Sequence, residues 1–248
     1  MQALLVKDLL VQNSLIHIFI VSGSHFLLLH KILAKLPIVR RHTLFILFGY
    51  ALMTLCQPPA LRALLFLVLL KISERWKLFL SPVFLVFLSA CLCVAVFPQW
   101  ITSRSLLMSL LAALIIALMS EFWGKKQHTL PALFLTQSAL YFVMAFPLWG
   151  FSDLHPLGVL LNLTLGPLIG GVLFPLGLLG AIVHPLAFLF DKALNLLIWI
   201  LERNTGFYGL KTEASPLSLF FQWVFFVFLV GVSYWTLIWK KRQKALNG

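Results

Sequence analysis

The sequence predicts an all-α, polytopic integral membrane protein with about eight or nine transmembrane, broken or re-entrant helices. Two observations support this class. Of the 248 residues, 61% are hydrophobic and only 10% are charged, whereas roughly a quarter of the residues of a soluble domain are charged. Apolar runs also recur along the whole chain, and a run of about 20 apolar residues is long enough to cross a bilayer as a helix.

The expected elements follow one another along the chain. Residues 1–14 have Lys7 and Asp8 among leucines and resemble an amphipathic interfacial lead-in; no small-residue cleavage site follows, so we predict no signal peptide. Residues 15–239 form the transmembrane domain, and residues 240–248 form a basic cytoplasmic tail. The predicted spans cover residues 15–31, 43–56, 59–72, 78–97, 104–122, 129–149, 157–183, 186–202 and 217–239.

Basic and aromatic residues mark the ends of these spans. The connections after the first, third, fifth and last spans carry thirteen of the 19 Lys and Arg residues, against four on the opposite side. Because cytoplasmic loops are enriched in Lys and Arg, we predict a membrane protein with its N-terminus outside and its C-terminus inside the cytoplasm. The net charge of +12 follows largely from this topology and does not by itself indicate a nucleic-acid partner. Interfacial tryptophans are expected at positions Trp76, Trp100, Trp123, Trp149 and Trp239.

The first span contains polar residues that a lipid-facing helix does not need. The stretch LIHIFIVSGSHFLLLH, residues 15–30, holds three histidines, two serines and a glycine. Ser14, His17, Ser24 and His25 fall on one helical face, and Gly23 between two serines permits local unwinding. This pattern fits a stripe that lines an aqueous cavity. The alternative is close helix packing, with Ser-Gly-Ser at a helix contact and the histidines hydrogen-bonded across it.

Arg62 is the second polar anomaly. It lies in CQPPALRALLFLVLLK, within the third predicted span, where an arginine costs about 2.5–3.5 kcal/mol on insertion scales unless it faces protein or water. The breaker Gln57-Pro58-Pro59 suggests a span that starts late or enters as a half-helix. Its N-terminal N–H groups would then point toward an anionic ligand beside the guanidinium. The alternative is an arginine that snorkels to the outer interface.

Segment 155–185 is the third anomaly, because it contains Asn162, Thr164, Pro167, Pro175 and six glycines. Helices this rich in Gly and Pro are typically kinked or broken, and broken helices form the binding sites of many transporters. Close helix packing explains the glycines better. An amide in mid-membrane, however, needs polar partners.

These polar residues do not predict an enzyme. Ser22 or Ser24 beside His25 supplies two parts of a hydrolase or acyltransferase site, but none of the seven acidic residues lies in this span. His17 and His25 lack further metal ligands at a recognisable spacing, and the sequence contains no Walker-type loop. We therefore predict no catalytic residue, no metal site and no cofactor. Packing accounts for the three cysteines, Cys56, Cys91 and Cys93.

Four segments resemble motifs of the ComEC competence family, in the family's order. HIFIVSGSHFLLL resembles the signature His-Leu-Leu-Ala-Ile-Ser-Gly-Leu-His-Ile, with Ser24 in place of the usual Leu. QPPALRALLF resembles the Pro-x-x-Arg-Ala-x-x-Met element, with Phe66 in place of Met. SPVFLVFLSA resembles Pro-Gly-Phe-Gln-Leu-Ser without the Gln, and LNLTLGPLIG resembles Asn-Leu-x-x-x-Pro. The matching residues of the first, second and fourth motifs are His17, Ser22, Gly23, His25, Pro59, Arg62, Ala63, Asn162 and Pro167.

The resemblance implies an inner-membrane channel component that passes single-stranded DNA into the cytoplasm during natural transformation. It implies single-stranded DNA and membrane lipid as partners, together with a cytoplasmic ATPase and an extracytoplasmic DNA receptor. The chain has room for neither the OB domain nor the metallo-β-lactamase-like domain that family members commonly carry, so we expect separate chains to supply them. The residues expected around the DNA path are His17, Ser22, Gly23, His25, Arg62 and Asn162.

Three other functions stay open from the sequence. A secondary transporter for a small anionic solute would use the same arginine and half-helix terminus. An intramembrane hydrolase or acyltransferase would use Ser22 or Ser24 as its nucleophile. A degenerate relative would keep the membrane scaffold and have lost transport.

Overall fold

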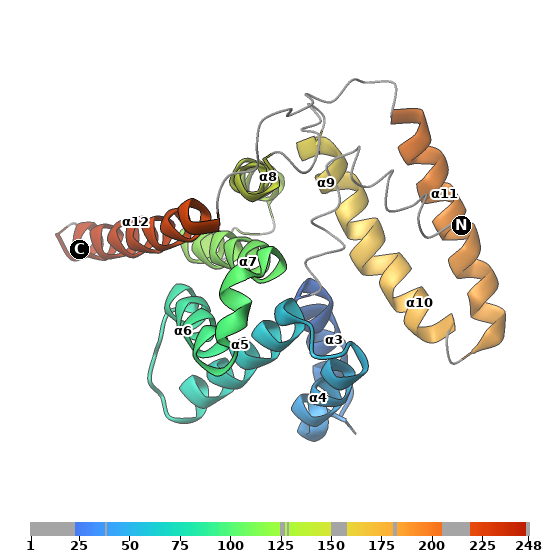
Figure 1. The fold of residues 1–248 in the computed structure, drawn as a ribbon, viewed down its shortest axis with the longest axis horizontal. Helices are drawn as coiled ribbons and strands as arrows, with labels where there is room; N and C mark the ends of the chain where they lie inside the picture. The colour runs from blue at the N-terminus through green and yellow to red at the C-terminus, as the bar shows by residue number, and fades with distance from the viewer. Residues whose placement is uncertain are drawn as a thin grey trace. The chain divides into compact units, whose positions relative to one another are not determined.

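A computed structural model describes residues 23–37, 39–124, 127, 129–149, 158–180, 183–204 and 219–246 (Figure 1). Every regular element in these ranges is a helix, which confirms the predicted all-α class. The described elements are α3 (Gly23–Lys35), the 3₁₀ turn η1 (Arg40–His42), α4 (Thr43–Met53), α5 (Pro58–Arg75), α6 (Pro82–Val96), the 3₁₀ turn η2 (Pro98–Thr102), α7 (Arg104–Trp123), α8 (Leu130–Leu148), α9 (Gly158–Leu168), the π-helical η4 (Ile169–Leu173), α10 (Phe174–Gly180), α11 (His184–Asn204) and α12 (Leu219–Leu246).

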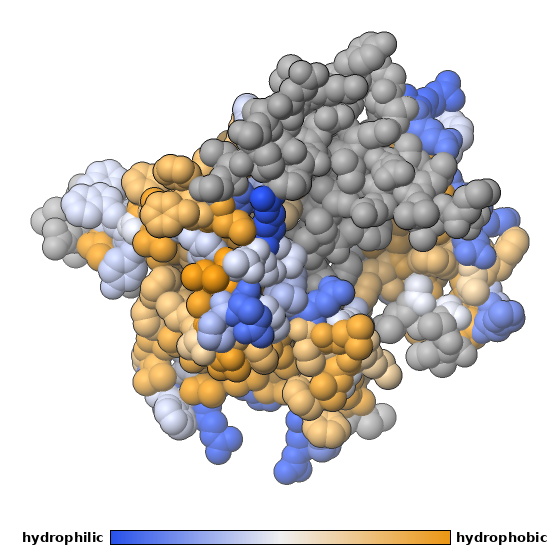
Figure 2. Space-filling model, in the orientation of Figure 1, coloured by the Kyte–Doolittle hydropathy of each residue, from blue (hydrophilic) through white to orange (hydrophobic). Residues whose placement is uncertain are grey.

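Four of the described helices are long and apolar enough to cross a membrane, namely α7, α8, α11 and α12. Helix α6 and the stretch Leu163–Gly177 are shorter apolar helices. The chain is therefore a polytopic membrane protein. Its helices form two compact units, one with α9 to α11 and one with α3 to α8 and α12. In the view of Figure 2, hydrophobic side chains cover most of the surface over α5 and α6, as a lipid-facing surface requires.

The second and third predicted spans differ from the observed helices in length. Helix α4 has only 11 residues, about 16 Å at 1.5 Å per residue, so it is too short to cross the hydrocarbon core alone, and the predicted span 43–56 was wrong. It ends where Leu55 and Cys56 adopt positive φ angles of 54° and 49°. Helix α5 has 18 residues and extends past both ends of the predicted 59–72. Prolines occupy its first turn, where a missing N–H is tolerated.

The seventh predicted span is irregular, as its composition indicated. Helices α9 and α10 are joined through a π-helical turn in which the N–H of Phe174 donates to the carbonyl of Ile169. Pro175 follows directly, and a proline removes a regular helical hydrogen bond and clashes with the preceding turn. At the end of α10, a Cβ on Gly180 would lie 3.2 Å from the backbone of Ala187 on α11. Close packing therefore explains this glycine, whereas a Cβ on Gly170 would meet nothing within 4 Å.

Helices α5, α6 and α7 form the packed centre of their unit. All three pairs of these helices are in contact, and α12 covers α6 and α7 from another side. Both α6 and α7 begin at a serine whose hydroxyl accepts a backbone N–H, at Ser81 and Ser103 respectively, which fixes where each helix starts. The fully buried leucines of α7 are Leu106, Leu107, Leu110, Leu111 and Leu114.

Candidate functional site

The buried centre of this unit contains a guanidinium group. Arg62 lies in the second turn of α5 and is only 2% exposed. Its Nη2 donates a hydrogen bond of 2.7 Å to Oγ of Ser109 on α7, and Ser109 is fully buried. This bond joins residues 47 positions apart in the sequence. Arg62 and Ser109 therefore connect α5 to α7 inside the protein.

Little else in the described structure balances the charge of Arg62. Its Nε is buried without a hydrogen-bond partner, and no carboxylate among the described residues pairs with it. The thiol of Cys93 on α6, also fully buried, lies within electrostatic reach of the guanidinium. Ser89 lies one turn earlier on the same face of α6, but its hydroxyl donates to its own helix, to the carbonyl of Val86 at 2.7 Å. The site is thus a cation beside weakly polar groups.

This arrangement is costly. A buried charge needs compensation by a counter-charge or several hydrogen bonds, and Arg62 has one described hydrogen bond. The first turn of a helix also carries positive partial charge, so an arginine beside it gains nothing from the helix dipole. No acidic residue occupies the first turn of α5. Stability therefore does not explain why the chain places an arginine here, and an ionisable residue buried inside a membrane protein is by default a candidate for function.

The first turn of α5 does not provide the anion-binding amides that the sequence suggested. Pro58 and Pro59 have no N–H groups. The N–H of Ala60 donates to the carbonyl of Gln57 at 2.9 Å, and the N–H of Gln57 donates to Thr54 at 3.4 Å. All of the first-turn amides are therefore absent or already bonded. The expectation of a half-helix terminus that binds an anion was wrong, because prolines and the Gln57 carbonyl saturate that turn.

Snorkelling was also wrong for Arg62. A snorkelling side chain keeps its charged head in water or among lipid headgroups, whereas this guanidinium is enclosed by α5, α6 and α7. The side chain faces protein instead. The sequence pointed to Arg62 through its cost in lipid, but it gave no signal for Ser109, which lies in an otherwise continuous apolar run on α7.

The other predicted site residues are described only in part. His17 and Ser22 lie outside the described residues. Gly23 begins α3, and the backbone of Gly23, Ser24 and His25 is helical, while nothing is described of their side chains. Helix α3 packs against α5, with Phe26 and Leu29 in one buried cluster with Ala60, Ala63, Leu64 and Leu67. The segment that begins at Gly23 and the segment that carries Arg62 are therefore neighbours. Asn162 lies on α9 in the other unit, and its side chain is outside the described part of the structure.

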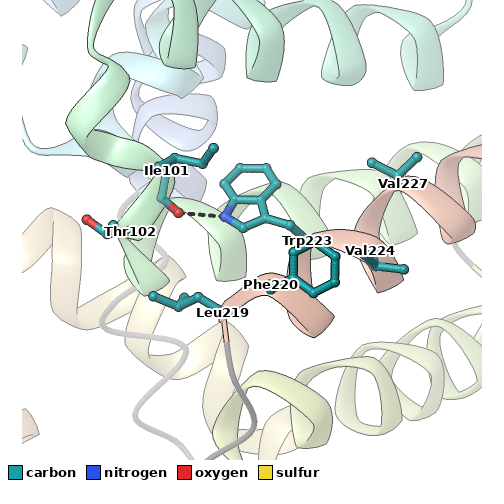
Figure 3. A pocket seen from close by; sticks show the side chains of 7 residues that line it. All are labelled: Ile101, Thr102, Leu219, Phe220, Trp223, Val224 and Val227. Atoms are coloured by element: carbon teal, nitrogen blue, oxygen red, sulfur yellow. Dashed lines mark hydrogen bonds between the residues drawn. The ribbon is translucent and has the colours of Figure 1, made fainter.

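The unit that contains Arg62 also has an open apolar groove of about 510 Å³ where η2 meets α12 (Figure 3). The indole N–H of Trp223 donates to the carbonyl of Ile101 at 2.6 Å across this contact. A second groove of about 410 Å³ shares Trp223 and runs along α6. Their linings carry no charged side chain, so they suit hydrocarbon rather than a phosphate chain. The first groove is lined by Ile101, Thr102, Leu219, Phe220, Trp223, Val224 and Val227.

Comparison with known families agrees with the motifs. Residues 6–242 match the family described as Competence protein. No curated protein and no solved structure matches the chain. The family match covers nearly the whole sequence, including all four motif segments and the buried arginine, and so the chain belongs to the Competence protein family.

Proposed function

We propose that this protein is a component of an inner-membrane channel that passes single-stranded DNA into the cytoplasm during natural transformation. Membership of the Competence protein family supports a role in DNA uptake. The observation that carries the proposal at the level of residues is Arg62. It is a buried cation with one neutral hydrogen-bond partner and no paired carboxylate among the described residues.

In this proposal Arg62 contacts the phosphates of the moving strand. The structure has Arg62 enclosed, so the strand is admitted only when α5 and α7 separate at the Arg62–Ser109 bond. A phosphate is a better partner than a serine hydroxyl, because it carries the opposite charge and can accept two parallel hydrogen bonds from the guanidinium. The strand would thus favour the open arrangement through its stronger contact with the guanidinium, which is how a ligand shifts a conformational equilibrium. Ser109 would hold Arg62 in the closed arrangement.

Other parts of the proposal follow from the same topology and family. The basic side of the protein faces the cytoplasm, with the N-terminus outside, and the chain acts without catalytic residues of its own. A motor is needed for directional import, and a cytoplasmic ATPase would supply it. An extracytoplasmic receptor would deliver the strand, and separate chains would supply OB or nuclease activity. His17, Ser22, Gly23, His25 and Asn162 would contribute polar contacts along the path.

The main competing function is a secondary transporter for a small anionic solute. That function also uses the arginine, but it drew support from a half-helix terminus with free amides. The first turn of α5 has none, which favours the DNA proposal.

The experiment is import of fluorescent DNA into the cytoplasm of competent cells, at matched membrane abundance of each variant. Arg62→Met is expected to leave DNA outside, because it removes the cation and keeps most of the side-chain volume. His17→Ala combined with His25→Ala is expected to impair import as well. Arg203→Met is the matched control, because Arg203 is exposed on α11 and stacks on Trp199. Import that is the same in all variants would contradict the proposal, and loss of uptake of a small anion with intact DNA import would favour the transporter.

A further inference from the structure

The connection between α5 and α6 has an unusual backbone. Lys77 and Phe79 adopt positive φ angles of 52° and 49°, which is uncommon for residues other than glycine. Three hydrogen bonds hold this conformation: Lys77 N–H to the carbonyl of Glu74 at 3.3 Å, Leu78 N–H to the carbonyl of Ser73 at 3.0 Å, and Leu80 N–H to the hydroxyl of Ser73 at 3.4 Å. Ser73 is itself buried. The connection is therefore a fixed turn anchored on α5.

This turn presents aromatic rings and cations together. Trp76 is 69% exposed and Phe79 is 92% exposed. Arg75 and Lys77 lie directly beside them in the sequence and are also exposed. The backbone at Phe79 is left-handed, and the hydrogen bond from the Leu80 N–H to the Ser73 hydroxyl stabilises it. This conformation keeps the Phe79 ring outside the packed helices. We call residues 75–79 the aromatic turn.

Further cations lie at the same end of this unit. The tight turn after α3 is closed by hydrogen bonds from Val39 and Arg40 to the carbonyl of Leu36, which places η1 next to the C-terminus of α3. Helices α3 and α5 pack side by side, and His30 on α3 lies within electrostatic reach of Lys71 and Glu74 in the last turns of α5, so the C-terminal parts of both helices lie at the same end of the unit. Apart from Arg75, which belongs to the aromatic turn, the exposed cations contributed by α3, η1 and α5 are Lys31, Lys35, Arg40, Arg41 and Lys71. Glu74 is the single acidic residue among these elements.

We propose that the aromatic turn and these cations form a binding surface for single-stranded DNA. The cations would contact phosphates while bases stack on Trp76 and Phe79, which is the combination that single-strand binding surfaces use. This inference rests on the proposed function, in which the basic end of the bundle faces the cytoplasm. The surface would receive the strand where it leaves the membrane. Binding here would draw the strand forward and oppose its return.

The fixed backbone favours a nucleic acid over lipid as the occupant. Trp, Lys and Arg at a helix end also suit the headgroup region, but a fluid lipid interface accepts an aromatic side chain in many orientations. Stacking on a base needs an aromatic ring at a defined position. A ring that is already fixed in that position loses less conformational entropy on binding. Residues held in a sparsely populated backbone region by surrounding hydrogen bonds are expected where such preorganisation is used.

The test uses the purified full chain in nanodiscs of neutral phosphatidylcholine. The probes are fluorescent oligothymidylate and an abasic strand of the same length, which keeps the phosphates and lacks bases. Trp76→Leu with Phe79→Leu is expected to weaken oligothymidylate binding at least about tenfold and to leave the abasic strand unaffected. Arg75→Gln with Lys77→Gln is expected to weaken both probes and to reduce the salt dependence of binding.

The matched control is Trp235→Leu with Phe228→Leu, two exposed aromatic residues on α12 (74% and 63% exposed). Circular dichroism would verify that each variant folds. The proposal is overturned if the wild type binds neither probe, if both probes bind equally well, or if the aromatic variant changes only partition into anionic vesicles. Import into cells, measured separately with Arg62→Met, tests the channel. Loss of strand binding without loss of import would reject this surface and leave the channel proposal intact.

Discussion

Helices α7 and α11 are both apolar and of membrane-crossing length, but their surroundings are opposite. Of the apolar window of α7, 56% is buried inside the protein, against 11% of the window of α11. Helix α7 is apolar on every side and contacts α5, α6 and α12. Helix α11 buries one stripe, which includes Leu197 and Leu201, and leaves Phe188 and Trp199 exposed. A helix that is apolar all round belongs inside a bundle, whereas an apolar stripe marks a helix with one protein face.

The comparison shows where a polar side chain can have a specific partner. On α7, Ser109 faces other helices and accepts a hydrogen bond from Arg62. On α11, Asp191 and Lys192 are exposed near the start of the helix, and the ammonium of Lys192 lies 4.6 Å from the ring centre of Phe188 on the same helix. The contact made by Ser109 joins two helices, while that of Lys192 is local. Contact with another helix therefore distinguishes the polar group that can act in a mechanism from the one that serves its own helix.

The largest expected effect is on apolar packing. Leu111→Ala removes a fully buried side chain from α7 and is expected to lower the free energy of unfolding by about 2–5 kcal/mol, as cavities in packed cores do. Leu196→Ala makes the same change on α11, where the leucine is 51% exposed, and is expected to cost much less. Unfolding in detergent with increasing SDS, followed by circular dichroism, measures both. Equal losses of unfolding free energy in the two variants would contradict the difference in burial between α7 and α11.

The next effect concerns the Arg62–Ser109 bond. Ser109→Ala is expected to lower the free energy of unfolding by about 1.5–3 kcal/mol, because a buried charged donor loses its acceptor. The control Ser89→Ala removes an equally buried serine whose bond stays within its own helix, and about 1 kcal/mol or less is expected there. Combining Ser109→Ala with Arg62→Met is expected to recover most of the loss, since a buried charge no longer lacks a partner. An additive double variant would show that the bond contributes little.

How much of this could be read from the sequence differs between the two kinds of helix. Composition and hydropathy predicted α7, α8, α11 and the membrane-crossing part of α12, Leu219–Trp239, within a few residues, because crossing a bilayer imposes a length and an apolar content that local sequence must supply. The same reasoning gave α4 too much length, because the turn at Leu55 and Cys56 is apolar and contains no glycine or proline before Pro58. Its left-handed backbone is closed by hydrogen bonds from the N–H groups of Leu55 and Cys56 to the carbonyls of Leu52 and Ala51, and no turn-forming residue marks it in the sequence.

Of the two residues that form the candidate site, the sequence predicted Arg62 but not Ser109. Arg62 stands out in an apolar run, because an arginine that faces lipid is costly. Ser109 does not stand out, since serines are common in membrane helices and only the fold determines which one faces an arginine 47 positions away. The free amides expected beside Arg62 failed for a local reason that the sequence contained: two prolines in the first turn leave few N–H groups to offer.

A smaller effect is expected from glycines, and it sharpens the contrast between helix faces. Gly180→Ala places a Cβ 3.2 Å from the backbone of Ala187 at the tight end of α11, and overpacking of this kind is expected to destabilise the protein by about 1–3 kcal/mol. Gly231→Ala on α12 meets nothing within 4 Å and is expected to stabilise it by about 0.5–1 kcal/mol through helix propensity. SDS titration of both variants measures whether each substitution lowers or raises the free energy of unfolding. If Gly231→Ala lowers the stability instead, then this face of α12 is packed against another part of the protein.

The smallest effect is expected where α12 meets η2. Trp223→Phe keeps an aromatic ring against Val227 and Ile101 but removes the indole N–H that donates to the Ile101 carbonyl at 2.6 Å, so a loss of about 0.5–1.5 kcal/mol is expected. Trp235→Phe on the same helix is the control, because Trp235 is 74% exposed and a lipid-facing ring tolerates the change. SDS titration of both variants, followed by circular dichroism, measures the two losses. The apolar window of α12 is 17% buried, close to the 11% of α11, so α12 is expected to have one protein face as well. If Trp235→Phe costs as much as Trp223→Phe, then α12 depends on both of its faces and this expectation is wrong.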